Sequence, residues 1–208
     1  MGQGHHPPPL LVVISGPSGV GKDSVLALMR RRDRPWHFVV TATTRPRRAQ
    51  EQEGMDYLFL APSQFEELLA QDGLLEHAEV YGYRYGVPRS QVEVALRAGQ
   101  DVIVKTDVQG ARTLRARVPG ALLIFLAPPS LQELERRLRE RKTESAEALR
   151  RRIATARQEL ACQSAFDHVV VNHNGRLKET VASIERIIGE EKARRARGDS
   201  HGERDFAL

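Results

Sequence analysis

The sequence predicts an α/β fold in which a parallel sheet is covered by helices on both faces. Short apolar runs of strand length alternate with helical patterns along the chain. The two most apolar runs, residues 10–14 and 121–127, have the length of buried strands. A glycine-rich turn directly follows the first run and leads into a helix. Alternating strands and helices are typical of a parallel sheet with helical cover.

Each element follows from its local pattern. Strands are predicted at residues 10–15, 38–42, 74–80, 101–106, 121–127 and 168–171. Helices are predicted at residues 22–32, 63–73, 90–98, 110–118, 146–164 and 177–195, with a further helix beginning at Ser130. Ser63 with Glu66 and Ser130 with Glu133 have the spacing of capping boxes, which predicts two of these helix starts.

Composition narrows the class of protein. With 208 residues, 40% hydrophobic and 28% charged, the chain resembles ordinary soluble proteins, and no apolar run approaches the roughly 20 residues that cross a bilayer. The start of the chain lacks the pattern of a signal peptide, so we expect a cytoplasmic location and no membrane partner. One cysteine, Cys162, excludes an intrachain disulfide, and its helical pattern predicts a buried, inert thiol.

The charge balance indicates an anionic partner. The formal net charge is +5 and the isoelectric point about 9.7. Aromatic residues make up only 5%, too few for the stacking surface of a single-strand binder, so we expect no nucleic-acid partner.

A phosphate-binding loop follows the first strand. Its residues are Gly16, Pro17, Ser18, Gly19, Val20, Gly21 and Lys22. Glycines let backbone N–H groups turn toward phosphate oxygens, the helix N-terminus adds partial positive charge, and Lys22 reaches the outer phosphates. This loop predicts a core of the P-loop NTPase type that binds ATP.

The residue after the loop lysine is unusual. A Ser or Thr hydroxyl normally holds Mg²⁺ at that position, but this chain has Asp23, followed by Ser24. A carboxylate can hold Mg²⁺ directly or through water, although it also repels phosphate. Asp23 is therefore a candidate ligand for a magnesium ion that accompanies ATP.

Several downstream motifs point to a phosphorylated acceptor. They are the segment from Thr41 to Arg48 (TATTRPRR), the segment from Gly54 to Tyr57 (GMDY), Glu76, the segment from Tyr83 to Pro88 (YRYGVP), and the segment from Asp107 to Gly110 (DVQG). Together with the phosphate loop they resemble the guanylate kinases, over residues 10 to about 189. The resemblance implies an ATP:GMP phosphotransferase of purine nucleotide metabolism, with Mg²⁺ as cofactor and ATP and GMP as substrates. It leaves open whether dGMP is accepted and whether the protein is a monomer or a homodimer.

The resemblance implies roles on the acceptor side. Guanine presents N1–H and a 2-amino group side by side, and one carboxylate can accept from both. That carboxylate would be Glu76, with Thr41 near the guanine O6. The acceptor phosphate would be held by guanidiniums and tyrosine hydroxyls, and Asp107 would lie near the acceptor nucleotide and the metal. The phosphate-binding residues would be Arg45, Arg48, Tyr57 and Tyr85.

Two positions depart from the family pattern. Lys105 stands where the family usually has an acidic residue, two positions before Asp107. Val87 replaces a usual Ser or Thr after Tyr-Gly, which removes one hydroxyl contact to guanine.

A mobile lid is implied near the end of the core. Arg141 and Arg152 match arginines that close over the transferring phosphate, where positioned cations stabilise the charge on the equatorial oxygens. The predicted catalytic residues are thus Lys22, Arg45, Arg141 and Arg152. Asn172 resembles a residue that flanks the adenine of ATP.

These assignments divide the chain. The predicted kinase core comprises residues 10–42, 89–140 and 155–195, with a GMP-binding subdomain at residues 43–88 and a helical lid at residues 141–154. Residues 1–9 and 196–208 are predicted tails.

Three alternatives remain at this point. The Gly-Lys-Asp-Ser end of the loop also resembles a relative that phosphorylates ribose 1,5-bisphosphate. A non-catalytic guanylate-kinase-like module that binds phosphopeptides typically loses the loop and lid arginines, which this chain keeps. A nucleic-acid binder would show tight binding to random DNA with a steep salt dependence.

Overall fold

The main sheet has five strands, all parallel. The computed structural model describes residues 7–80, 82–140 and 146–198. The sheet contains β1 (Leu11–Ser15), β2 (Trp36–Phe38), β7 (Asp101–Lys105), β8 (Leu122–Ala127) and β9 (His168–Val171), in the order β2-β7-β1-β8-β9. The predicted parallel sheet is confirmed.

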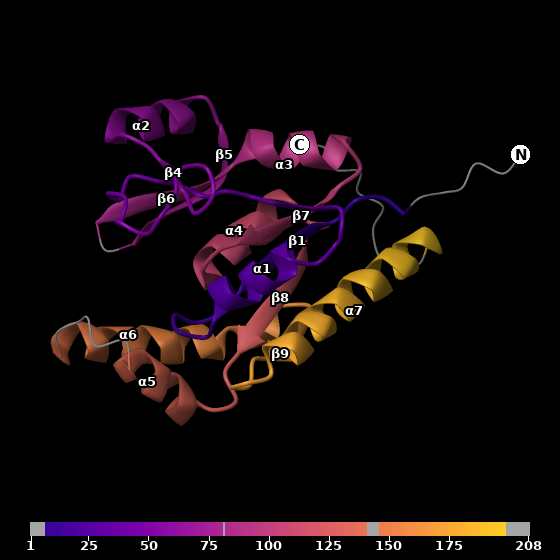
Figure 1. Ribbon diagram of the computed structural model, residues 1–208. Helices are drawn as coiled ribbons and strands as arrows, with labels where there is room; N and C mark the ends of the chain where they lie inside the picture. Colours follow the sequence, from indigo (N-terminus) through magenta and orange to yellow (C-terminus); the bar gives the residue numbers. More distant parts are fainter. Residues whose placement is uncertain (1–6, 81, 141–145, 199–208) are drawn as a thin grey trace, which may run out of the picture.

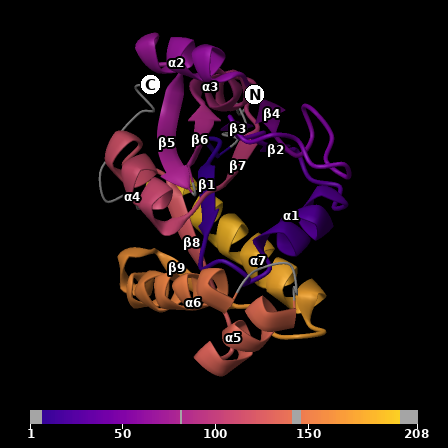
Figure 2. The ribbon, with the colours of Figure 1, turned by 90° about the vertical axis from the view of Figure 1, so that its left-hand side faces the viewer.

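Helices cover both faces of this sheet because neighbouring side chains of a strand point to opposite faces. Val12 and Ile14 of β1 pack in one apolar cluster with α1 (Lys22–Arg30), α5 (Leu131–Glu140), α6 (Ala146–Ala161) and α7 (Leu177–Ala196). Leu11 and Val13 pack in the other cluster, with α3 (Arg89–Arg97) and α4 (Val108–Arg117). Figure 2 shows α4 on one side of the sheet and α1 and α7 on the other.

A second, smaller sheet lies above the main sheet in the view of Figure 1. It contains β3 (Ala42–Thr43), β4 (Leu58–Phe59), β5 (Leu74–Val80) and β6 (Tyr83–Pro88), in the order β4-β3-β6-β5. Helix α2 (Pro62–Ala70) contributes Phe65 to a separate small core with Ala42 and Leu74. Arg117 of α4 donates to the Leu74 carbonyl at 2.9 Å, which ties this sheet to the main body.

One predicted strand is divided in the structure, and two strands of the second sheet have no predicted counterpart. The strand predicted at residues 38–42 is split, because Trp36–Phe38 pairs with β7 while Ala42–Thr43 joins the second sheet. Strands β4 and β6 were not predicted, because their two and six residues lie among turn residues without clear alternation.

The two predicted helix starts have different outcomes. Helix α2 begins at Pro62, and Gln64 Oε1 accepts from the Ala61 N–H at 2.8 Å, so the predicted Ser63–Glu66 capping box is wrong. Ser130 Oγ does accept from the Glu133 N–H at 3.1 Å, which confirms the predicted start of α5.

Other predicted elements hold within a few residues. Helix α6 ends at Ala161, and a short 3₁₀ helix, Gln163–Ala165, follows it. Cys162 lies between them and is half-buried at a pocket, so the prediction of a buried thiol is wrong. Among the described residues, no helix is both long and apolar enough to span a membrane.

Candidate active site

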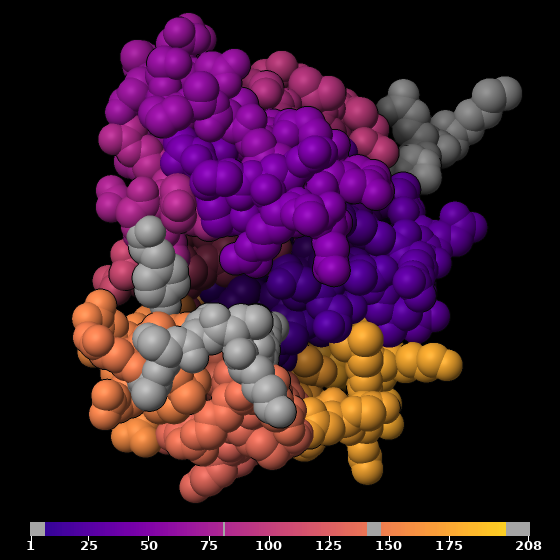
Figure 3. All heavy atoms as spheres, turned by 60° about the vertical axis from the view of Figure 1, so that its left-hand side comes forward, coloured from indigo at the N-terminus to yellow at the C-terminus, as the bar shows by residue number. Residues whose placement is uncertain are grey.

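A pocket of about 690 Å³ opens at the carboxyl ends of β1 and β7. Figure 3 shows a hollow between the second sheet and the α5–α6 region. Ligands of parallel α/β sheets gather at this edge. Residues from the phosphate loop, the second sheet, α4 and α6 line it, among them Pro17, Ser18, Gly19, Gly21, Lys22, Asp23, Thr41, Tyr57, Glu76, Tyr85, Lys105, Asp107, Arg152 and Glu159.

The phosphate loop connects β1 to α1 and depends on its glycines. A Cβ on Gly16, whose φ is 142°, would lie 2.3 Å from the Leu126 carbonyl oxygen of the adjacent strand β8. Gly21 has a φ of 101°, and a Cβ there would lie 2.6 Å from Asn172 Nδ2. Both positions therefore need glycine for conformation and for space.

Side chains behind the loop fix its shape. Asn172, only 6% exposed, donates from Nδ2 to the Val20 carbonyl at 2.8 Å and accepts from Thr180 Oγ1 at 3.1 Å. Arg137 donates to the same Val20 carbonyl at 3.2 Å and to the Asn172 carbonyl at 2.9 Å. Asn172 is thus beneath the loop and is not among the residues that line the pocket.

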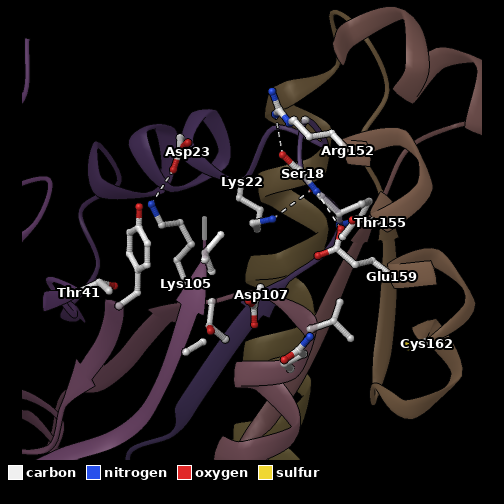
Figure 4. A pocket seen from close by; sticks show the side chains of 18 of the residues that line it. Ser18, Lys22, Asp23, Thr41, Lys105, Asp107, Arg152, Thr155, Glu159 and Cys162 are labelled. Atoms are coloured by element: carbon white, nitrogen blue, oxygen red, sulfur yellow. Dashed lines mark hydrogen bonds and ion pairs between the residues drawn. The ribbon is translucent and has the colours of Figure 1, made fainter. Parts of the chain in front are cut away.

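Lys22 lies along the inside of the loop (Figure 4). Its Nζ donates to the carbonyls of Gly16 and Pro17, the latter at 3.2 Å. Burial lowers the pKa of this ammonium, while Glu159, Asp23 and Asp107 oppose the change and Lys105 adds to it. A desolvated ammonium beside loop N–H groups is suited to bind phosphate oxygens.

Helix α6 brings two charged groups to the mouth of the loop. Arg152 donates to Ser18 Oγ at 2.8 Å and is 9% exposed. Glu159 Oε2 accepts from the Ser18 N–H at 3.3 Å, and burial raises the pKa of this carboxyl despite the nearby Lys22. Sequence reasoning missed Glu159, because nothing in the local pattern of α6 distinguishes it from a solvated helical glutamate.

The acceptor side of the pocket contains Thr41, Tyr57, Glu76, Tyr85 and Asp107. The rings of Tyr57 and Tyr85 lie 6.0 Å apart, centroid to centroid.

Glu76 of β5 is only 4% exposed. Burial, and secondly the charge of Asp107, raise the pKa of its carboxyl to about 7. Asp107 Oδ1 accepts from the Gly110 N–H at 2.7 Å, so Asp107 also caps α4.

Arg45, Arg48 and Val87, which the sequence singled out, are not among the residues that line this pocket. Arg45 forms an ion pair with Glu51 at 2.7 Å and lies over the Tyr57 ring at 5.4 Å, next to the pocket but not lining it. Arg48 is exposed and does not line it either. Val87 is fully buried in the core cluster with α3 and α4. Arg141 falls outside the described residues.

Asp23 and Lys105 form an ion pair across the pocket wall. The Lys105 Nζ lies 2.8 Å from Asp23 Oδ1 and 5.3 Å from the centroid of the Tyr57 ring. Burial lowers the pKa of Lys105, but Asp23 and Tyr57 outweigh it, so the net effect is a raised pKa. The sequence marked Lys105 as a departure from a pattern, without indicating its partner.

The oxygen donors near the loop can serve a magnesium ion that arrives with ATP. Among the described residues there is no cluster of three or more acidic, His or Cys ligands. Mg²⁺ in nucleotide sites typically takes most ligands from phosphates and water, with one or two protein oxygens. Asp23 and Ser24 at the start of α1 line the pocket and fit that limited role.

The fold and the site together define a P-loop nucleotide kinase. It has a parallel sheet, a glycine-rich phosphate loop with its lysine, and a second pocket wall that carries Glu76 and two tyrosines. A family model described as guanylate kinase matches residues 9–191. A guanylate kinase of Gloeobacter violaceus is 47% identical over 186 residues, which is 89% of this chain and 90% of that protein. One from Thermobifida fusca is 49% identical over 171 residues, 82% of this chain and 87% of that protein.

A solved structure agrees. The crystal structure of guanylate kinase from Anaplasma phagocytophilum superposes with a TM-score of 0.71 at 31% identity, covering 89% of this chain and 87% of that one. The chain therefore belongs to the guanylate kinase family.

Proposed function

We propose that this protein transfers the γ-phosphoryl group of ATP to the phosphate of GMP, giving ADP and GDP. The observation that carries the proposal is that the phosphate loop and Glu76 line the same pocket. A kinase must hold donor and acceptor together, because orienting two reactants supplies much of the rate enhancement.

On the donor side, the loop N–H groups and Lys22 bind the ATP phosphates. Lys22 lies in the loop and turns from the Gly16 and Pro17 carbonyls to the phosphates when they bind. Arg152 at Ser18, joined by Arg141, stabilises charge on the transferring group. Asn172 acts on ATP through the loop that it supports.

On the acceptor side, Glu76 selects guanine. Its carboxylate accepts from N1–H and the 2-amino group, and adenine offers no such pair. Tyr57 and Tyr85 donate to the acceptor phosphate, while Arg45, held beside Tyr57, and Arg48 approach it when GMP binds. The acceptor phosphate is already an anion, so no general base is required.

A magnesium ion with ATP would be held mainly by the phosphates, with Ser24 and, through water, Asp23 as protein ligands. It would neutralise charge that develops on the phosphate oxygens. The residues named above bind and orient the substrates.

Two segments around the pocket would move when the substrates bind. Residues 43–88 form a GMP-binding unit and residues 141–154 a lid, and both close on the core to exclude water. We propose a cytoplasmic protein, monomeric or dimeric, without nucleic-acid or membrane partners.

An acceptor comparison tests the activity. ADP formation would be measured with ATP and Mg²⁺ and, in turn, GMP, dGMP, AMP, UMP, CMP and ribose 1,5-bisphosphate. We expect turnover with GMP and little with AMP. Turnover with the sugar bisphosphate alone would overturn the proposal, and no turnover with any acceptor would indicate a binding module.

A further inference from the structure

Two ammonium groups enter the pocket from adjacent strands. Lys22 follows β1, and Lys105 ends β7, where it is in register with Ile14 of β1. Lys22 belongs to the phosphate loop. The proposed function gives Lys105 no role, although it lines the same pocket (Figure 4).

Stability alone does not explain the Asp23–Lys105 pair. The Asp23 side chain is 80% exposed and needs no partner to remain charged, whereas the Lys105 side chain is only 25% exposed. Partly desolvating a lysine is unfavourable, and an ion pair with an exposed carboxylate returns little free energy. The pair therefore adds little to stability, and a half-buried cation in the pocket wall is suited to a functional role.

The position of the ammonium supplies that reason. Its Nζ is held between Asp23 Oδ1, 2.8 Å away, and the Tyr57 ring, 5.3 Å away. A lysine stem ordinarily loses much rotamer freedom when it binds a ligand, and a stem fixed in advance avoids that cost. Lys105 is thus a pre-positioned cation beside the tyrosine that is proposed to bind the acceptor phosphate.

The arginines expected at that phosphate do not line the pocket. Arg45 is paired with Glu51, and Arg48 is exposed outside the pocket lining. Lys105 instead brings a positive charge to the pocket lining beside Tyr57, where it can bind a dianionic phosphate.

We infer that Lys105 binds the phosphate of the acceptor nucleotide and that Asp23 is the positioning residue for its ammonium. The inference rests on the proposed function, since it assigns a further ligand within the proposed acceptor site.

The experiment compares two ligands that differ by the phosphate. Equilibrium binding of GMP and of guanosine would be measured without ATP or Mg²⁺ for the wild type and for Lys105→Met, which keeps the apolar stem. A lost charge-assisted hydrogen bond predicts about 10- to 100-fold weaker GMP binding and unchanged guanosine binding.

Lys192→Met is the matched control. Lys192 also pairs with an aspartate of β7, Asp101, at 2.7 Å and is 26% exposed, but it is remote from the pocket lining. It should alter thermal stability and leave both ligand affinities unchanged.

A double-mutant cycle tests the role of Asp23. Asp23→Asn should weaken GMP binding in the wild type and have no further effect in Lys105→Met, because the two residues act as one unit. Additive losses would overturn the positioning role.

The other outcomes are equally distinct. Equal loss of GMP and guanosine binding in Lys105→Met would show a structural role and overturn the inference, as would unchanged GMP binding. If Lys105→Met fails to fold, Lys105→Gln gives the same comparison. A wild type that binds neither ligand would contradict the proposed function itself. If the wild type and Lys105→Met bind GMP with equal affinity, only the inference is contradicted.

Discussion

The Glu76 carboxylate packs directly against Gly110 in the first turn of α4. A Cβ built on Gly110 would lie 2.6 Å from Glu76 Oε1 and 2.1 Å from Thr106 Oγ1. Gly110 has no positive φ, so the requirement for glycine here is steric. Glu76 of the second sheet therefore packs against the first turn of α4, and this contact fixes the position of its carboxylate.

This contact predicts an unusual effect of Gly110→Ala. Alanine in a helix is normally favoured over glycine by about 1 kcal/mol. Here the methyl group displaces the side chains of both Thr106 and Glu76, so we expect GMP binding to weaken at least about tenfold while ATP binding is unchanged. Gly189→Ala in α7, where nothing lies within 4 Å, is the control and should only raise the melting temperature. Unchanged GMP affinity in Gly110→Ala would contradict the proposed place of Glu76 in the acceptor site.

GMP binding should depend on pH through Glu76. Burial and Asp107 raise the pKa of its carboxyl to about 7. Only the charged carboxylate accepts from both guanine donors, so GMP affinity should fall as pH drops below about 7, by up to about tenfold per pH unit, and level off above it. Calorimetric titration between pH 5.5 and 8.5 would measure this. Glu76→Gln should bind GMP without this pH dependence, and a wild type with a flat profile would contradict the assignment.

Glu76→Gln should also raise the free energy of unfolding at high pH while it lowers the selectivity for GMP over AMP. A raised folded-state pKa means that the contribution of Glu76 to stability is full below its unfolded value of about 4.5 and is lost as pH rises through about 7. Removing the buried charge should therefore increase the free energy of unfolding at pH 8 by roughly 1–3 kcal/mol, with little gain at pH 4. The preference for GMP over AMP should fall in the same variant. Retained preference would remove Glu76 from guanine recognition.

Sequence reasoning found those parts of the molecule that depend on local patterns. The apolar run at β1, the glycines and Lys22 define the loop because strand, turn and helix are consecutive. The second sheet was harder, because β3 and β4 have two residues each and owe their pairing to partners distant in sequence. Trp36–Phe38 and Ala42–Thr43 looked like one strand, since only three-dimensional pairing shows that the chain changes sheets between them.

The candidate site shows the same limit. The sequence marked Asp23 and Lys105 as two separate departures, 82 positions apart, and only the structure shows that they bond to each other. Asn172 was identified as a residue near ATP, but its hydrogen bonds run to the loop backbone and to Thr180. Glu159 carried no signal, because a glutamate on a helix becomes informative only when the opposing loop is in place.

Asn172→Ala should weaken ATP binding, although Asn172 supports the loop from beneath and does not line the pocket. The variant loses the bond to the Val20 carbonyl and the bond from Thr180 Oγ1, which keeps the Arg176 carbonyl as an acceptor at 3.4 Å, so the loop is less well ordered. We expect a loss of about 1–3 kcal/mol in stability and a several-fold weaker affinity for ATP, with GMP affinity unchanged. Thr180→Val, which keeps the side-chain volume, should produce a smaller effect of the same kind. Equal losses for ATP and GMP would indicate general destabilisation instead.

Glu159→Gln should strengthen ATP binding. Glu159 Oε2 accepts from the Ser18 N–H at 3.3 Å, and loop N–H groups of this kind are the donors that cradle phosphate. Incoming phosphates must therefore displace a carboxylate of the same charge sign, which also attracts Lys22.

We expect several-fold to about tenfold tighter ATP binding in Glu159→Gln, measured without GMP. The control Glu135→Gln should show no change, because the Glu135 carboxylate pairs with Arg157 on the outer side of α6. Because burial raises the pKa of Glu159, wild-type ATP affinity should approach that of the variant as pH falls and the carboxyl becomes neutral. Weaker ATP binding in Glu159→Gln would instead mean that the carboxylate orders the loop for phosphate, and the displacement account would be wrong.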